Sequence, residues 1–370
     1  MFDAMVEAFP GADLLCLWSD VEDRYPGREL TETWLARTPL RRRKALALPA
    51  MVPTWRGRRP GGYDWALVST HLFAHHVSFD ASPADFRKYV YVHSPARYVW
   101  DPELDTRGAG VLPRTVGPAL RALDRRRARE HHAVAANSAF VRERVRRAWG
   151  RDADVIHPPV EVERIQAAGA WRDRLSPAER ARLDALPRPF VLGASRFVPY
   201  KRLDLVVAAG EAAGLPVVLA GKGPGRAELA ARAAEASVPV TVVDAPSDAM
   251  LYALYQEAAV FVFPAVEDFG IMPVEAMAAG TPVVGLREGG TSETVLDGTT
   301  GVLLESFASA ASLAAAVTAA ADLDRAACRE HAQRFGRRTF DDRIRTWTGA
   351  ASTAGEVARS SAAASGELDV

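Results

Sequence analysis

The chain has 370 residues, of which 48% are hydrophobic and 25% are charged. This length suits two domains, and this composition is that of a globular protein rather than a disordered chain. The 46 basic and 46 acidic residues cancel to a net charge of zero, whereas proteins that bind nucleic acid are normally strongly basic. We therefore expect no nucleic-acid partner.

The cysteines and the lack of recognisable targeting signals indicate the cellular compartment in which we expect the protein. Cys16 and Cys328 match no metal-binding or redox spacing and cannot form a disulfide framework, which favours a reducing compartment. No stretch approaches the roughly 18 apolar residues that a membrane span needs. The first residues also lack the basic region of a signal peptide. We therefore expect a cytoplasmic protein.

The first half of the chain alternates short apolar runs with helix-forming stretches. The runs predict strands at Leu14–Trp18, Ala66–Ser69, Tyr89–His93, Ala133–Asn137 and Asp154–His157. An arginine-rich helix is expected over Pro118–His131. The polar stretch Trp171–Pro189 contains three prolines, which is typical of a connection between domains. This pattern predicts an α/β domain followed by a linker.

The second half repeats the alternation more regularly. Its apolar runs predict buried parallel strands at Phe190–Leu192, Val217–Ala220, Val240–Val243, Val260–Phe263, Pro282–Val284 and Val302–Leu304. Helices are expected over Arg226–Ala236 and Ala249–Glu257 between them. Strands and helices in alternation predict a doubly wound parallel sheet. Residues 352–370 are rich in Ala, Ser and Gly, which predicts a disordered tail.

The most informative segment follows the fourth of these strands. A loop with Glu267 and Gly270 leads into a helix that begins near Met272 and contains Glu275. The N–H groups that open such a helix suit a phosphate, and the two carboxylates suit hydroxyl groups on either side of it. Early acidic residues also simply suit the helix dipole, so the spacing alone leaves both interpretations open.

Glu267-x₇-Glu275, with Phe269-Gly270 between, resembles the signature of retaining glycosyltransferases of family 4. The resemblance extends upstream to the segment Gly193–Asp204. Downstream it includes Gly289-Gly290-Thr291-Ser292-Glu293. These motifs occur in the order and spacing of the family, over roughly residues 190–305.

The resemblance implies an α/β chain of the GT-B fold, with two Rossmann-like doubly wound domains facing across a cleft. Residues 1–175 would be the acceptor-binding domain and residues 185–335 the nucleotide-sugar-binding domain. Residues 336–350 would form a helix that returns toward the first domain. One feature departs from the family, because Met1–Asp13 looks like the first helix and the turn after it. The first strand and its Gly-Gly loop therefore look absent from this sequence.

The resemblance also implies the role of each site residue in the second half. Arg196 and Lys201, one of only four lysines, would neutralise the donor's pyrophosphate. Glu275 would accept the ribose hydroxyls, and Glu267 would act as a catalytic residue that holds sugar hydroxyls beside the anomeric carbon. Backbone N–H groups would meet the phosphate and the sugar at Phe269, Gly270 and Ile271.

In the first half, His93 ends a predicted strand and is followed by Ser94-Pro95. The resemblance implies a catalytic histidine here that faces the donor sugar. The longer motif with Arg97, Trp100 and Asp101 is similar to bacterial mannosyltransferases that build surface polysaccharides from GDP-mannose. His71, His75 and His76 form a cluster, and the first two have the i,i+4 spacing that can bind zinc on a helix. Because no third ligand is nearby in the sequence, an acceptor-facing or surface position is favoured.

The sequence therefore predicts an enzyme that moves a hexose, with mannose favoured, from a nucleotide-diphosphate sugar such as GDP-mannose to an acceptor hydroxyl. No cofactor and no metal are expected, and the acceptor would be a lipid-linked glycan or a small-molecule glycoside. The basic clusters Arg41–Lys44 and Arg125–Arg129 suit solvated helix faces, and their functional interpretation is peripheral contact with an anionic membrane at its inner face. Alternatives are a sugar-nucleotide 2-epimerase and a non-catalytic sugar-nucleotide-binding protein. A dinucleotide-dependent oxidoreductase is disfavoured because the glycines at 221, 223 and 225 have the wrong spacing.

Overall fold

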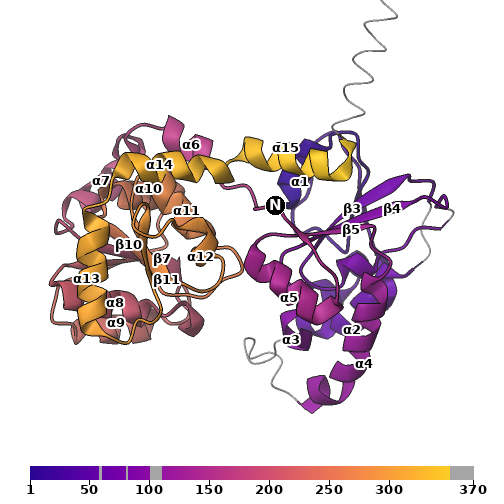
Figure 1. Ribbon diagram of the computed structural model, residues 1–370, viewed down its shortest axis with the longest axis horizontal. Helices are drawn as coiled ribbons and strands as arrows, with labels where there is room; N and C mark the ends of the chain where they lie inside the picture. Colours follow the sequence, from indigo (N-terminus) through magenta and orange to yellow (C-terminus); the bar gives the residue numbers. More distant parts are fainter. Residues whose placement is uncertain (58–60, 81, 101–110, 351–370) are drawn as a thin grey trace, which may run out of the picture. The chain divides into compact units, whose positions relative to one another are not determined.

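The computed structural model describes residues 1–57, 61–80, 82–100 and 111–350 (Figure 1). The chain divides into two compact units, one comprising Met1–His157 with Asp341–Val370 and the other Pro158–Phe340. Both are α/β units built on parallel strands. The predicted tail at 352–370 and the predicted motif residue Asp101 lie outside the described residues.

The second unit contains one six-stranded parallel sheet with the order β12-β11-β10-β7-β8-β9. Its strands are β7 (Val191–Arg196), β8 (Val217–Lys222), β9 (Val240–Asp244), β10 (Val260–Phe263), β11 (Val283–Leu286) and β12 (Gly301–Leu304). All six predicted strands are confirmed. The chain winds outward from β7 to one edge, then returns to β10 beside β7 and winds outward to the other edge. This is the doubly wound order, with its switch point between β7 and β10.

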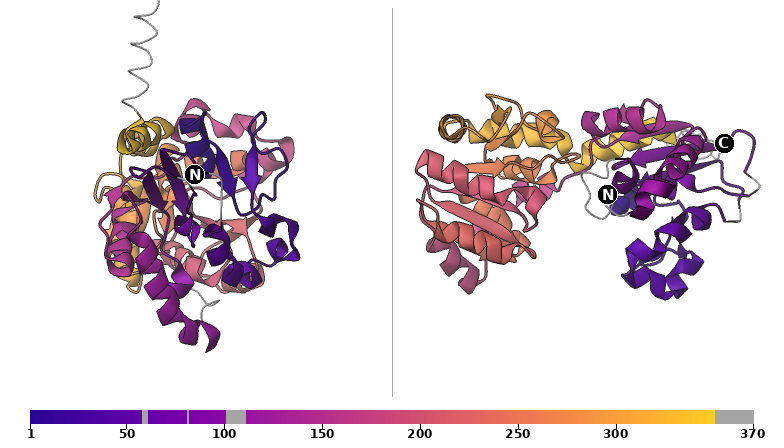
Figure 2. Two further views of the ribbon diagram at one scale, coloured as in Figure 1. Left: turned by 90° about the vertical axis from the view of Figure 1, so that its right-hand side faces the viewer. Right: turned by 90° about the horizontal axis from the view of Figure 1, so that it is seen from below.

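Alternating side chains of this sheet fill two separate cores. In β10, Val260 and Val262 pack on one face of the sheet, and Phe261 and Phe263 pack on the other. Helices cover both faces (Figures 1 and 2). The first core includes residues of α8 (Leu203–Ala213) and α13 (Ala310–Ala321), and the second includes residues of α10 (Asp248–Glu257), α11 (Ile271–Ala278) and α14 (Arg325–Ala332). The second unit also contains the short helices α9 (Arg226–Ala234) and α12 (Thr291–Thr294).

The second unit begins earlier than the sequence predicts. The segment expected to be a linker forms η6 (Trp171–Arg174) and α7 (Pro177–Asp184), preceded by α6 (Val162–Ala167). Ser176 and Glu179 close a capping box at the start of α7. Trp171 and Leu183 are buried in the same core as β10. Pro177 therefore marks the start of a helix, because proline suits the first turn of a helix. Pro187 and Pro189 lie in the short connection from α7 to β7.

The first unit contains a four-stranded parallel sheet and a separate pair of parallel strands. The sheet has the order β3-β4-β5-β6, with β3 (Trp65–Thr70), β4 (Arg87–Val92), β5 (Ala133–Ala136) and β6 (Asp154–Val155). The pair consists of β1 (Leu14–Cys16) and β2 (Leu30–Glu32). All five predicted strands are present with shifted ends. The sequence analysis missed β2, which is short and mostly exposed.

Helices of the first unit are α1 (Phe2–Ala8), α2 (Lys44–Trp55), α3 (Arg97–Trp100), α4 (Val111–Ala128) and α5 (Ala139–Trp149). The predicted arginine-rich helix corresponds to α4, which begins earlier than expected. The unit boundary falls inside α15 (Arg337–Thr348). Past that boundary, Trp347 donates a hydrogen bond of 2.9 Å to Asp154, and Arg345 donates one of 3.1 Å to the carbonyl of Ala8.

None of the helices in the described part of the chain combines the length and the hydropathy that a membrane span requires.

The assignment of α7 to the second unit can be tested by core truncation. Leu183 is fully buried, so Leu183→Ala should lower the free energy of unfolding by about 2–5 kcal/mol. Hydrogen exchange measured at increasing urea concentrations should show this loss of stability in peptides from residues 158–340. Leu296→Ala, at a position 42% exposed in the same unit, is the control and should change little. An effect confined to peptides from residues 1–157 would contradict the assignment.

Candidate functional site

The predicted donor-binding residues follow two strands that are neighbours in space. Strand β7 ends at Arg196 and strand β10 ends at Phe263, and the two strands pair in parallel. Their carboxyl ends therefore open at the same edge of the sheet, at the switch point of the winding. In open α/β sheets, ligands bind at this place because the two loops turn away from each other and leave a crevice.

The loop after β7 holds one basic side chain at the surface and buries the next. Arg196 is exposed and donates a hydrogen bond of 2.8 Å to the hydroxyl of Tyr200. Lys201 ends the short turn η7 (Pro199–Lys201) and is only 7% exposed. Arg202 then adopts a left-handed conformation with φ of 51° as the chain enters α8. The tight turn thus directs Lys201 inward while Arg196 stays in contact with solvent.

Lys201 forms an ion pair with Glu267, which lies in the loop after β10. Its ammonium group lies 5.1 Å from the ring centroid of Tyr200 and 5.7 Å from that of Phe263. The Lys201 side chain is 8% exposed and that of Glu267 is 25% exposed. An ion pair this shielded interacts more strongly than a surface pair, and removing one partner leaves the other charge poorly compensated.

Glycines let a third loop pack directly against the loop that contains Glu267. The N–H of Gly290 donates a hydrogen bond of 2.8 Å to the carbonyl of Glu267. A Cβ at Gly290 would lie 2.2 Å from the Cα of Phe269, and one at Gly289 would lie 2.7 Å from the carbonyl oxygen of Glu267. No side chain fits at either position. The paired glycines therefore fix the backbone in front of α11.

Gly270 caps the N-terminus of α11 with φ of 84°, in the left-handed region that favours glycine. Phe269 before it is 4% exposed, whereas Ile271 after it is 47% exposed. The first N–H groups of an α-helix have no partner within the helix and carry the positive end of its dipole. This end of α11 therefore offers an anion-binding group beside the pair of Lys201 and Glu267.

Glycines also shape the loop after β8. Gly221 and Gly223 have φ values of 147° and 155°. A Cβ at Gly221 would lie 1.8 Å from the carbonyl oxygen of Ser195, and one at Gly223 would lie 2.6 Å from that of Phe197. The turn at these glycines thus packs directly on the backbone that bears Arg196. It supports the site as well as connecting a strand to a helix.

Glu275 lies one turn inside α11 and is mostly buried. Burial raises the pKa of its carboxyl group to about 7, and the negative charges of Asp248 and Glu161 act in the same direction. The hydroxyl of the fully buried Tyr255 donates to it at 3.5 Å and opposes this rise. A buried carboxyl group with a pKa raised this far is typical of a ligand-binding site.

The structure therefore gathers every predicted donor-binding residue of the second half at one edge of one sheet. The sequence analysis missed Tyr255 as the partner of Glu275 and Tyr200 as the partner of Arg196. Tyr200 lies within the matched segment and could have been noticed there. The contact of Tyr255 comes from the packing of α10 on α11, and no local sequence signal reports it.

His93 belongs to the first unit, where it directly follows β4. Its Nε2 lies 2.8 Å from the hydroxyl of Ser69 at the end of β3. Burial lowers the pKa of His93 to about 4, and the nearby His71 adds to this effect. The imidazole is therefore neutral at pH 7, so it can exchange hydrogen bonds but carries no charge.

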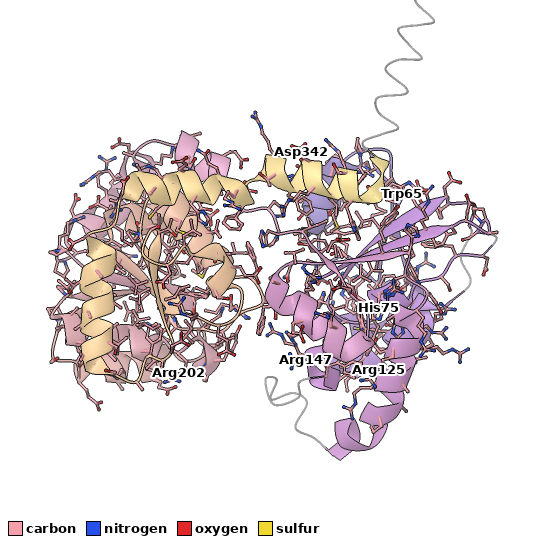
Figure 3. All side chains as sticks on the ribbon, viewed as in Figure 1. Trp65, His75, Arg125, Arg147, Arg202 and Asp342 are labelled. Carbon is pink, nitrogen blue, oxygen red and sulfur yellow. The ribbon has the colours of Figure 1, made fainter. Side chains whose placement is uncertain are left out.

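His71 is exposed, as expected, but the two histidines after it contradict the expectation of an acceptor-facing or surface position. His75 and His76 are 0% and 1% exposed, and His75 lies inside the first unit (Figure 3). Their Nε2 atoms lie 3.0 and 2.9 Å from one oxygen of Asp124. The other oxygen accepts the indole N–H groups of Trp100 and Trp149 at 2.8 and 2.7 Å.

Among the described residues, His75, His76 and Asp124 are the group whose atoms lie close enough to share a metal ion, within 4.8 Å of one another. The sequence analysis missed Asp124, which lies far away in the chain. Burial would raise the pKa of its carboxyl group, but the nearby His75 and the hydrogen bonds from His76 and Trp100 hold it well below the usual range. These contacts already satisfy a buried carboxylate, so Asp124 is explained as the centre of a hydrogen-bonded core.

Comparison with known proteins shows which family part of the chain resembles. The family Glycosyl transferases group 1 matches residues 177–341. A D-inositol 3-phosphate glycosyltransferase from Streptomyces scabiei is 30% identical over 69% of this chain and 59% of its own length. A GDP-mannose-dependent alpha-(1-6)-phosphatidylinositol monomannoside mannosyltransferase from Mycolicibacterium smegmatis is 32% identical over 51% of this chain and 53% of its own length. The chain thus spans about half to three fifths of these relatives.

Solved structures show the same architecture. A sucrose-phosphate synthase from Thermosynechococcus elongatus superposes with a TM-score of 0.66 at 22% identity, covering 91% of this chain and 86% of that one. The two α/β units are those of the GT-B fold, as predicted. Residues 177–341 are similar to a domain of the Glycosyl transferases group 1 family.

The raised pKa of Glu275 predicts how stability depends on pH. Between the ordinary value of 4.5 and the folded value of about 7, the folded state holds a proton that the unfolded state releases. The free energy of unfolding therefore falls as the pH rises through this range, by about 3 kcal/mol in all. Glu275→Gln removes this contribution. The free energy of unfolding of the variant should therefore increase relative to that of the wild type as the pH rises from 5 to 8.

Urea titrations at the two pH values measure this difference. Glu228→Gln, at an exposed glutamate on α9, is the matched control and should keep the pH dependence of the wild type. If Glu275→Gln kept it as well, the raised pKa of Glu275 would be refuted.

Proposed function

We propose that the protein is a retaining, metal-independent hexosyltransferase that moves mannose from GDP-mannose to an acceptor hydroxyl. The observation that supports it best is the shielded pair of Lys201 and Glu267 beside the N-terminus of α11, at the switch point of the sheet. The similarity to group 1 glycosyl transferases supports sugar transfer, and the similarity to a GDP-mannose-dependent mannosyltransferase from Mycolicibacterium supports GDP-mannose as the donor.

The diphosphate of the donor binds at the anion-binding side of this site. Arg196 is exposed at the end of β7 and reaches it from solvent. Lys201 and the N–H groups of Gly270 and Ile271 meet it from the protein side. Negative charge grows on the diphosphate as the glycosidic bond breaks, so these groups stabilise the transition state more than the bound donor.

Glu267 has two functions in this proposal. One carboxylate oxygen holds the ammonium group of Lys201 in place. The other is free to accept a hydrogen bond from a sugar hydroxyl beside the anomeric carbon. Positive charge develops on the sugar as the diphosphate departs, so the negative charge of Glu267 acts most strongly in the transition state.

Glu275 binds the ribose, which lies away from the reacting carbon. With a pKa of about 7, its carboxyl group is part protonated in the free protein near neutral pH. Two ribose hydroxyls that donate to it favour the ionised form. Binding of the nucleotide therefore lowers the pKa of Glu275 and releases a fraction of a proton near pH 7.

His93 acts from the first unit. It is neutral, and Ser69 orients its ring through the contact with Nε2. We assign it a hydrogen bond to a hydroxyl of the donor sugar, which holds the sugar in the orientation that the reaction needs. Its low pKa makes it a positioning group for the sugar rather than a proton donor.

In the reaction, the bond between the anomeric carbon and the diphosphate oxygen breaks, and a bond to the acceptor oxygen forms on the same face of the sugar. The acceptor hydroxyl gives its proton to the departing diphosphate, which thus leaves as GDP. The mannosyl group keeps its anomeric configuration. The acceptor is a lipid-linked glycan or a small-molecule glycoside.

A cytoplasmic enzyme with peripheral contact at an anionic membrane suits such a lipid-linked acceptor. Arg42, Arg43, Arg126 and Arg129 have exposed side chains and are available for that contact. Arg125 is less available for membrane contact. Its guanidinium group donates a hydrogen bond of 2.8 Å to the carbonyl of Ala148 and lies 4.9 Å from the ring centroid of Trp100.

The diphosphate assignment predicts the effect of Lys201→Ala. Turnover of GDP-mannose should fall by about 10²–10³, the scale for losing one charge-stabilising group. Glu267→Gln should lower turnover as well, and the double variant should lose much less than the product of the two effects, because the two side chains act as a pair. Steady-state rates of GDP release measure all three.

Arg232→Ala is the control, since this arginine pairs with Glu211 away from the site. Wild-type turnover by Lys201→Ala would contradict the proposed function. Release of GDP without any glycoside product, at equal rates with and without acceptors, would instead favour a sugar-nucleotide hydrolase.

The separate roles of the carboxylates and His93 predict different kinetic effects. Glu275→Gln should raise KM by about 5–100-fold, because losing a charged acceptor costs about 1–3 kcal/mol. Glu267→Gln and His93→Ala should instead lower kcat more than they raise KM. Steady-state kinetics with one donor tests all three. If Glu275→Gln changed only kcat while Glu267→Gln changed only KM, the two roles would be reversed.

A further inference from the structure

Three histidines lie together in the core of the first unit. His75 and His76 end the short turn η3 (Ala74–His76), which follows β3, and His131 follows α4. They are 0%, 1% and 4% exposed (Figure 3). Between ring centroids, His75 lies 4.5 Å from His76 and 5.3 Å from His131. Each ring brings two polar nitrogen atoms into the core, and each of these atoms needs a partner there.

Hydrogen bonds satisfy the carboxylate of this cluster but not its histidines. Asp124 accepts hydrogen bonds from His76 and from two indole groups. Among the described residues, however, neither ring nitrogen of His75 or His131 has a hydrogen-bond partner, and Nδ1 of His76 has none either. Nε2 of His75 lies 3.0 Å from the carboxylate but outside hydrogen-bonding geometry. Buried polar atoms without a partner in the chain are usually satisfied by an ordered water molecule or an ion.

The charge of Asp124 distinguishes an ion from a water molecule. This carboxylate is 0% exposed. No lysine or arginine of the described residues forms an ion pair with it, and its ionic contacts are the two adjacent imidazoles. Buried charges in native proteins are paired with an opposite charge or bound to a metal ion. A divalent cation would compensate the carboxylate and bind the histidine nitrogens at the same time, whereas a water molecule brings no charge.

The ligand atoms of such a cation already converge. Nε2 of His75 and Nε2 of His76 lie 3.0 and 2.9 Å from the same oxygen, Oδ1 of Asp124, and the three atoms lie within 4.8 Å of one another. Atoms that bind one zinc ion at about 2.0–2.1 Å lie about 3.3 Å apart at the tetrahedral angle. The two nitrogen atoms therefore need to move away from the oxygen by only a few tenths of an ångström.

Two tryptophans hold the carboxylate in this orientation. The indole N–H groups of Trp100 and Trp149 donate hydrogen bonds of 2.8 and 2.7 Å to its second oxygen, Oδ2. Oδ1 is therefore left to face the imidazoles. Carboxylates that bind metal ions are usually held by such outer hydrogen bonds, which orient the ligand oxygen.

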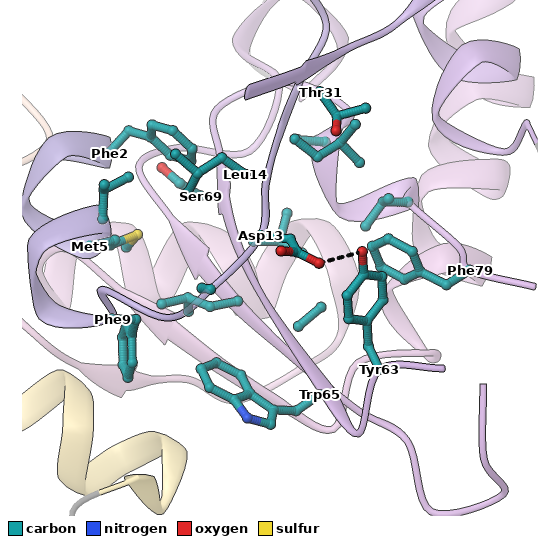
Figure 4. Close-up of a pocket in the computed structure, with 18 of the residues that line it drawn as sticks. Phe2, Met5, Phe9, Asp13, Leu14, Thr31, Tyr63, Trp65, Ser69 and Phe79 are labelled. Carbon is teal, nitrogen blue, oxygen red and sulfur yellow. Dashed lines mark hydrogen bonds between the residues drawn. The ribbon is translucent and has the colours of Figure 1, made fainter. Parts of the chain in front are cut away.

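The cluster is separate from the large cavity of the first unit. This cavity has a volume of about 1250 Å³ (Figure 4), and Ala74 and Val77 are among the residues that line it. His75 and His76 lie between these two residues in the chain and do not line the cavity. Their side chains thus point away from the open space and into the core.

We infer that His75, His76 and Asp124 bind a structural zinc ion and that His131 turns to supply the fourth ligand. Imidazole nitrogen and carboxylate oxygen are ordinary zinc ligands, and structural zinc sites have four protein ligands with no open position. Two histidines and one carboxylate also suit the iron of oxygenases, but that chemistry needs open positions on the metal, and these side chains are closed off from solvent.

The ion joins the turn after β3 to helix α4 and has no part in the sugar transfer proposed above. The sequence alone does not predict this site, because Asp124 and His131 lie far along the chain from the two adjacent histidines.

Metal titration of the full chain without a histidine tag tests the inference. The protein is dialysed against a chelator and titrated with Co²⁺, which absorbs visible light strongly when it is bound in a tetrahedral site, and Zn²⁺ is then added in competition. We expect one Co²⁺ per chain and its displacement by one Zn²⁺. The unfolding temperature should rise with the Zn²⁺ concentration, because an ion that binds only the folded state stabilises it.

Two variants and a matched control locate the bound ion. Asp124→Asn keeps an acceptor oxygen for the indole groups but removes the negative ligand, so its Zn²⁺ affinity should fall by about 100-fold or more and its tetrahedral Co²⁺ spectrum should be lost. His131→Gln should lower the affinity by about tenfold or more. His132→Gln, at the exposed histidine next to it, is the control and should bind like the wild type.

Equal Zn²⁺ binding by the wild type and both variants would overturn the inference, because the ions would then lie on surface groups. So would a wild type that shows no tetrahedral Co²⁺ spectrum and no change of unfolding temperature with Zn²⁺; the cluster would then hold water. If Asp124→Asn failed to fold, X-ray absorption of the zinc-loaded wild type would decide. Four nitrogen and oxygen ligands at about 2.0–2.1 Å, with three imidazoles among them, would support the site, and six oxygen ligands would contradict it.

Discussion

The ion pair of Lys201 and Glu267 joins two loops that only the order of strands brings together. Lys201 follows β7 and Glu267 follows β10, and these strands are neighbours because the sheet reverses its winding between them. The glycines at 289 and 290 then fix the loop of Glu267 in front of α11. Every other feature of the proposed donor site depends on this junction of the loops after β7 and β10, because it places the ammonium group of Lys201 beside the N-terminus of α11.

The site balances charges that burial makes costly. Lys201 is compensated by Glu267, whereas Glu275 has a phenol as its partner and an elevated pKa. A nucleotide diphosphate would suit both conditions, since its phosphates attract the lysine and its ribose hydroxyls stabilise the carboxylate. In the free protein, ionisation of Glu275 is therefore unfavourable, and the proposed donor would make it favourable. Ionisable groups with strongly shifted pKa values are common in binding sites. His93, neutral in its own unit, adds orientation rather than charge.

The sequence predicts the second unit well because its strands are continuous apolar runs between glycines and prolines, which is a local signal. Its site residues were found through motifs, and the structure brings them together. Packing partners were not predictable in this way. Trp171 and Leu183 look like parts of a polar linker until the core that buries them is known. His75 and His76 look exposed until Asp124 and two indole groups from distant segments surround them. These contacts join residues far apart in the chain, so no local pattern reports them.

The central claim is that the junction of the β7 and β10 loops binds a diphosphate. Hydrogen exchange of the whole chain with GDP, compared with guanosine at equal saturation, tests it most directly. GDP should protect the backbone of residues 196–201 and 267–271 several-fold, and guanosine should leave these segments unchanged, because only GDP presents phosphates to Lys201 and to the start of α11. Equal protection by both compounds, or protection by GDP only at other segments, would contradict the account.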